Sequence, residues 1–142
     1  MRNLAVILAA LALAACSTTP VTRSHSEAVN PAQVLAPELQ KASVERSEPV
    51  LLIRDAGFMG SLMDAIVAID GKNSVILKPS QRFEFYLAPG NHMFSIKPDK
   101  NLLSEPTSET DVEIRPNGPN SFRLRLISGD GPRIERSVQI QD

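Results

Sequence analysis

From Pro49 onward, apolar residues alternate with polar ones, and this period-two pattern restricts the chain to β structure. Phe83, Phe85 and Leu87 alternate with charged or polar neighbours, and the same spacing recurs over residues 92–96 and 122–126. Successive side chains of a strand point to opposite faces, so this spacing gathers the apolar side chains on one buried face. No run after residue 49 has the period of an amphipathic helix. The pattern therefore predicts an all-β domain over residues 49–142.

Turn sequences divide this domain into short strands. Asp70-Gly71 is the strongest hairpin signal, because Gly adopts positive φ without steric cost. Pro89-Gly90, Asn117-Gly118 and Gly129-Pro132 mark further turns, and residues 98–110 read as a long polar loop. The spacing of these signals predicts a small β-sandwich of about seven or eight antiparallel strands.

The last strand is expected to contain Ile134, Val138 and Ile140. Its charged stretch Arg133-Arg136 suits the edge of a sheet, where charge protects against pairing with other chains.

The first fifteen residues have the pattern of a secretory signal peptide. Arg2 supplies an early positive charge, and the twelve residues Leu4–Ala15 are apolar. This run is shorter than the roughly 20 residues of a membrane-spanning helix. The sequence therefore predicts export of the chain.

Leu13-Ala14-Ala15-Cys16 resembles a bacterial lipobox. The resemblance implies cleavage between Ala15 and Cys16, with palmitate-type acyl chains attached at Cys16. Cys16 is the only cysteine, so an internal disulfide is excluded and lipidation explains the single thiol. Ser17 resembles an outer-membrane sorting residue. An ordinary signal peptide followed by a coincidental cysteine is the alternative.

Residues 16–48 are rich in Ser, Thr, Pro and Ala and contain no aromatic residue, which predicts a flexible linker. As a coil, about 30 residues would span roughly 30 Å on average. Pro37-Ala42 is the one stretch that suits a short helix, with Pro at its first position. The segment is read as a spacer between the membrane and the domain, or as a connection of no required length.

Composition excludes several classes of partner. The formal net charge is −1 and the basic residues are not clustered, so nucleic acid is not expected as a partner. Two histidines, separated by the linker, do not supply a metal site, and no cofactor motif is present. Gly57-Ser61 is glycine-rich but lacks the lysine of a phosphate-binding loop, so it is interpreted as an ordinary connection.

Several short motifs follow one another in the order of a known family. They are Arg54, Gly60-Ser61, Ile69-Lys72 and Pro89-His92, followed by Asn117-Gly118 with Phe122-Arg125. Over residues 50–127 this order resembles an uncharacterised bacterial lipoprotein domain of unknown function, related to PEGA-like domains. The Gly-x-x-Pro that PEGA domains carry after the hairpin is missing. The resemblance implies a small β-sandwich with an accessory role and brings no catalytic residues.

Candidate functional residues have simpler structural explanations. His92, with Asp70 or Asp64 and a serine such as Ser61, would be the centre of a hydrolase or transferase. Its position after the Pro89-Gly90 turn favours a structural role instead. The same holds for Asp70 and Gly71, which we expect to form a turn. Five arginines could form a basic strip, although an ordinary solvated face is favoured: Arg115, Arg123, Arg125, Arg133 and Arg136.

The sequence therefore predicts a non-enzymatic envelope lipoprotein, held in the membrane by acyl chains on Cys16 and facing the periplasm from the outer membrane. An envelope protein or the cell wall is the expected partner, reached through an exposed strand edge or loop. The alternatives are the His92 enzyme and a carrier of a small apolar ligand.

Overall fold

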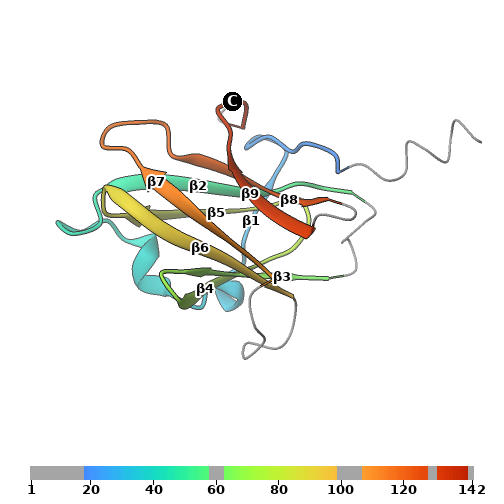
Figure 1. Ribbon diagram of the computed structural model, residues 1–142, viewed down its shortest axis with the longest axis horizontal. Helices are drawn as coiled ribbons and strands as arrows, with labels where there is room; N and C mark the ends of the chain where they lie inside the picture. Colours follow the sequence, from blue (N-terminus) through green and yellow to red (C-terminus); the bar gives the residue numbers. More distant parts are fainter. Residues whose placement is uncertain (1–17, 58–62, 99–106, 128–130, 141–142) are drawn as a thin grey trace, which may run out of the picture.

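The structure is a computed structural model that describes residues 18–57, 63–98, 107–127 and 131–140. These residues form nine strands in two sheets, which confirms the predicted all-β sandwich (Figure 1). The lipobox-like Leu13-Cys16 and the Gly60-Ser61 motif lie outside the described residues.

The five-stranded sheet has the order β1–β5–β2–β8–β9, and the four-stranded sheet has the order β4–β3–β6–β7. The strands of the first sheet are β1 (Glu27–Ala28), β5 (Gln81–Leu87), β2 (Glu48–Arg54), β8 (Ser121–Ile127) and β9 (Gly131–Arg136). The strands of the second sheet are β4 (Lys72–Leu77), β3 (Ala65–Ile69), β6 (Gly90–Pro98) and β7 (Ser108–Ile114).

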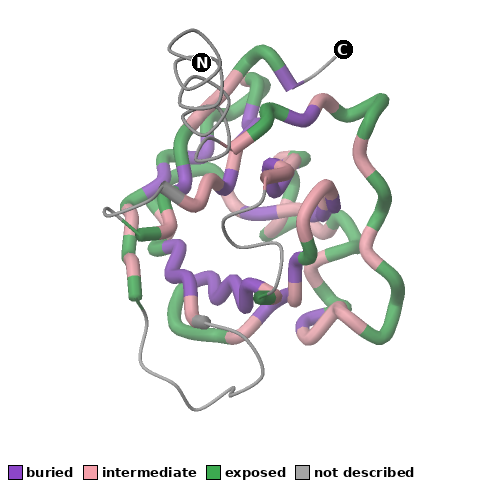
Figure 2. Tube along the Cα trace, turned by 90° about the vertical axis from the view of Figure 1, so that its right-hand side faces the viewer, coloured by how far each residue is buried: buried purple, intermediate pink, exposed green. Residues whose placement is uncertain are grey.

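The core lies between the two sheets and contains the alternating apolar residues that predicted the strands. Phe94 of β6 is at its centre, with ring centroids 6.3 Å from Phe85 and 5.9 Å from Phe122. Phe83 stacks on Phe85 at 4.7 Å. Figure 2 shows buried stretches of the chain within the molecule and long exposed stretches at its periphery. Burial of these side chains supplies the main driving force for folding.

The Asp70-Gly71 hairpin forms as predicted between β3 and β4. Asp70 has φ 51° and Gly71 has φ 79°, the two positive values that a type I′ turn requires. After Pro89, the chain passes from β5 in one sheet to β6 in the other. These turns place Asp70 and His92 beside one another.

Two strand pairs are parallel, so the prediction of antiparallel strands alone is corrected. β2 runs parallel to β8, and β1 runs parallel to β5. The chain changes sheets several times, so several neighbouring strands, such as β5 and β2 or β2 and β8, are not consecutive in sequence. Alternation shows which face of a strand is buried, and it carries no information on the direction of the neighbouring strand.

Residues 18–40 are attached to the sandwich, which corrects the expected flexible linker over its described part. We call this segment the strap. It contains β1 and two short 3₁₀ helices, η2 (Pro31–Gln33) and η3 (Pro37–Gln40), and can be followed in Figure 1 from β1 to the helices near β4. The second of these helices lies within the stretch for which a short helix was predicted.

Backbone hydrogen bonds and a few apolar side chains hold the strap. Glu27 N donates to Ser80 O at 2.9 Å beside β5, and Ala36 N donates to Ser74 O at 3.1 Å beside β4. Val29, Val34 and Leu39 pack against the main core. The composition of this segment did not indicate the strap, because the backbone groups at an unpaired strand edge form hydrogen bonds with another segment whatever side chains it carries.

The chain after β9 also differs from the prediction. β9 ends at Arg136, and Val138 is exposed instead of continuing a strand. Ile140 is fully buried outside the main core, where it packs with Val21 and Ile53 on the outer face of the five-stranded sheet. The predicted sheet edge at residues 133–136 is confirmed, because β9 is the outermost strand of its sheet.

Candidate functional site

The two ends of the sandwich differ in the strand ends and turns that they contain. At the proximal end β2, β4, β6 and β8 end, and the strap begins there because Thr19 pairs with Ala56 just beyond β2. The distal end carries the Asp70-Gly71 turn, the β5–β6 corner and the turn before β8.

His92 and Asp70 form a pair at the distal end. His92 Nδ1 lies 2.7 Å from Asp70 Oδ2, and His92 Nε2 lies 3.0 Å from the carbonyl oxygen of Ala88. The other carboxylate oxygen of Asp70 accepts a hydrogen bond from Met93 N at 2.9 Å. The pair therefore ties the β3–β4 turn to the corner between β5 and β6.

This geometry gives the hydrolase or transferase alternative no support. A general base needs a ring nitrogen within reach of the proton that it removes, and both nitrogens of His92 already have partners within the protein. Asp64, the other candidate acid, lies at the proximal end, where its negative charge favours the charged form of Arg54. Ser61 lies outside the described residues.

A pocket of about 390 Å³ lies next to this pair, between the strap and the β3–β4 turn. Its lining includes Leu39, Ile69 and Leu87. At its rim, Lys72 forms an ion pair with Glu38 that lowers the pKa of this carboxyl group. The pocket combines an apolar floor with a charged rim, as small-molecule sites often do.

A second groove, of about 480 Å³, lies on the outer face of the five-stranded sheet, toward the distal end. Pro49 and Leu51 of β2 and Tyr86 of β5 contribute to its floor. Tyr86 is the only tyrosine of the chain. Residues 118–121 line the groove as well, so the turn before β8 and the first residue of that strand supply part of its polar groups.

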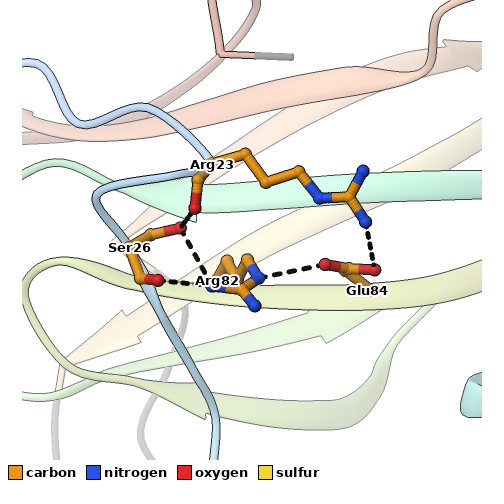
Figure 3. A network of polar contacts seen from close by, with 4 residues as sticks. All are labelled: Arg23, Ser26, Arg82 and Glu84. Atoms are coloured by element: carbon orange, nitrogen blue, oxygen red, sulfur yellow. Dashed lines mark hydrogen bonds and ion pairs between the residues drawn. The ribbon is translucent and has the colours of Figure 1, made fainter. Parts of the chain in front are cut away.

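The strap forms the remaining border of this groove through a polar network (Figure 3). Arg23 donates to Glu84 at 2.9 Å, and Glu84 also accepts from Arg82 Nε at 3.0 Å. Arg82 in turn donates to the carbonyl oxygen of Ser26 on the strap. Sequence analysis did not single out these residues, because their pairing depends on the strap lying across β5.

Arg54 is fully buried at the proximal end of the core and connects the two sheets. Its guanidinium donates to Leu77 O of β4 at 2.5 Å and to Met63 O before β3 at 2.6 Å. Burial lowers the pKa of Arg54 to about 10, and the negative charge of Asp64 opposes this shift. The arginine of the quoted family motif is therefore a structural residue.

Asp55 is buried where the strap crosses β2. Its Oδ1 lies 3.1 Å from Arg123 Nε and accepts a hydrogen bond from Val21 N at 3.2 Å. Burial raises the pKa of Asp55, although the Val21 N–H and the Arg123 charge both favour ionisation. A charged residue directly after a buried apolar strand was the only sequence signal for this site.

The five arginines do not form a basic strip. Arg123 pairs with buried Asp55, and Arg125 pairs with Glu135 at 3.2 Å. Arg136 turns toward the core, where its guanidinium lies 4.8 Å from the ring centroid of Phe122 and burial lowers its pKa. Arg123, Arg125 and Arg136 thus each contact a different partner within the protein.

Parts of the strand edges are covered, which limits the predicted partner binding through an edge. The strap pairs with the first two residues of β5 through β1 and with the middle of β4 through residues 34–36. On the other side, Arg136 of β9 donates to the carbonyl oxygen of Glu113 on β7 and so joins the two outermost strands. Within the described residues, the grooves are therefore better candidates for a partner than the edges.

The described residues contain no group of three or more metal-ligating side chains and no helix long and apolar enough to cross a bilayer. The chain matches no protein-family model, no curated protein and no solved structure. The resemblance to a lipoprotein domain therefore remains a prediction from the sequence motifs.

Proposed function

We propose that this protein is an envelope lipoprotein that is anchored through acyl chains on Cys16 and binds a partner without catalysing a reaction. One observation carries the proposal: a charged start and a twelve-residue apolar run lead into Leu13-Ala14-Ala15-Cys16, which contains the only cysteine. Export with a single lipidated thiol explains this combination. The partner is an envelope protein or the cell wall, and Ser17 favours the outer membrane.

The arrangement of the described residues supports a binding role. Both grooves lie toward the distal end, whereas the strap begins at the proximal end near the anchor. A partner on the periplasmic side would reach Tyr86 and Leu51 without approaching the membrane. An aromatic side chain on a partly apolar floor is a common centre of protein interfaces.

Substitution of Cys16 by alanine tests the anchor. We expect the Cys16→Ala protein to leave the membrane fraction or to stay uncleaved, because no thiol remains for acylation. Cell fractionation and intact-mass measurement of the mature chain check this result. A Ser17→Ala control keeps the thiol and should remain membrane-bound. Retention of Cys16→Ala as a cleaved membrane protein would contradict lipid anchoring.

Crosslinking in the native envelope tests the binding role. A photocrosslinking amino acid in place of Tyr86 should give a discrete adduct with one envelope component, identified by mass spectrometry. The same amino acid in place of Lys78, at the proximal end, is the matched control and should not give this adduct. Identical adduct patterns from both positions would argue against the groove as the partner site.

A further inference from the structure

The strap fixes the start of the described chain to the proximal end of the sandwich. Thr19 N donates to Ala56 O at 2.7 Å, and Ala56 N donates to Thr19 O at 3.0 Å. Two residues later, Val21 is buried against Ile53 and Ile140 and donates to Asp55. The sandwich therefore holds the described chain from Thr19 onward, and not only from the end of a long linker.

Little chain separates this attachment from the predicted anchor. Three residue steps connect Cys16 to Thr19, and an extended chain covers at most about 3.6 Å per residue. An acylated Cys16 would thus lie within about 11 Å of Thr19. A spacer of roughly 30 Å, as expected for a coil of about 30 residues, does not exist if the strap stays attached.

We propose that the proximal end of the sandwich lies directly against the lipid surface that holds Cys16. This inference rests on the proposed lipid anchor and adds an orientation to it. The occupant of this end is the bilayer surface itself, because the chain outside the structure leads there within a few residues. Exposed Lys78 and half-exposed Met63 lie at the same end and suit the interfacial region.

In this orientation the distal end stands away from the bilayer. β6 contains nine residues, and at about 3.3 Å per residue it spans about 30 Å between the two ends. The Asp70-Gly71 turn and both grooves are then held away from the lipid. A partner would bind at a defined height above the membrane.

Tryptophan fluorescence offers a direct measurement, because the chain contains no native tryptophan. Lys78→Trp places a single donor at the proximal end, and Asn91→Trp places one at the exposed start of β6 at the distal end. Each lipidated protein is reconstituted in phosphatidylethanolamine–phosphatidylglycerol vesicles that contain dansyl-labelled headgroups. We expect energy transfer from position 78 to be several-fold higher than from position 91.

Two controls make the result specific. A flexible Gly-Ser insertion of about 20 residues before Thr18, with an average span of about 25 Å, should abolish the difference between the two positions. Equal transfer from both positions without the insertion would overturn the proposed orientation. Circular dichroism verifies that each variant is folded.

Failure of the lipid anchor is distinguished by a second preparation. Residues 16–142 are coupled through the Cys16 thiol to a maleimide lipid in the same vesicles. If native acylation is absent but this preparation shows the difference between positions 78 and 91, the orientation holds and the proposed anchor fails. If mass spectrometry shows acylation but positions 78 and 91 transfer energy equally, the proposed anchor holds and the proposed orientation fails.

Discussion

Replacement of Arg54 by methionine is expected to lower the free energy of unfolding by about 2–4 kcal/mol. Methionine fills similar space but donates no hydrogen bonds, so Leu77 O and Met63 O lose their guanidinium partner. Relief of the buried positive charge offsets part of this cost, since burial already lowers the pKa of Arg54. Urea unfolding followed by circular dichroism measures the change.

Two further variants show whether the guanidinium itself is responsible. Arg54→Lys keeps the charge but loses the planar fork that reaches both carbonyl groups, so we expect an intermediate loss of stability. Arg125→Met removes a half-exposed arginine paired with Glu135 and should cost less than about 1 kcal/mol. If the Arg54→Met protein is as stable as the wild type, apolar packing alone joins the sheets at this end.

Replacement of Asp55 by alanine is expected to cost about 3 kcal/mol, because it breaks a buried ion pair by removing one partner. Arg123 would keep its charge with only 12 % of its side chain exposed, and Val21 N would lose its acceptor. Proteolysis should then cut the strap before the sandwich. Glu135→Ala, which removes the partner of Arg125 at the surface, is the matched control and should leave the strap protected.

The contribution of Asp55 to the stability of the fold decreases as the pH rises. Burial raises the pKa of Asp55 in the folded state, so the folded protein binds more protons than the unfolded chain between the ordinary and the raised value. The stability from this group is therefore greatest at low pH and declines as the pH rises through the raised value. Relative to Asp55→Asn, which does not titrate, the wild type should gain stability on acidification from pH 7 to about pH 4.5. An unchanged difference between the two proteins would contradict the raised pKa.

Three of the motif residues, Arg54, Asp70 and His92, make contacts that hold the fold together. Asp70 and His92 tie a hairpin turn to the corner between the sheets, and Arg54 ties the sheets together at the other end. Residues whose side chains could take part in catalysis or binding thus make structural contacts at both ends of a small core. This explains why sequence motifs with a histidine and an aspartate need not indicate catalysis.

The fold class was predictable because it depends on local patterns. Alternation through residues such as Phe83 and Phe85 identified strands and buried faces, and Asp70-Gly71 identified a turn with two positive φ values. The parallel pairing of β2 with β8 was not predictable. It depends on which strands meet after the chain has changed sheets.

The candidate site was predictable only in part. Asp70 and His92 were named together, and their contact is formed. The groove around Tyr86 was missed because its border comes from Arg23, which is more than sixty residues away in sequence. The buried Asp55–Arg123 pair was missed for the same reason, because a charge gains a buried partner only through tertiary contacts.

The sequence by itself determined the β-sandwich and its main turns, because periodicity and glycine conformation are properties of neighbouring residues. The lipid anchor stays a prediction from a short targeting motif. Only the tertiary structure decided that residues 18–40 form a strap instead of a spacer. The strap sequence buries little apolar surface, and its backbone groups gain partners only where the edges of β4 and β5 are already formed. The proposed position of a lipid anchor close to the proximal end rests on that contact.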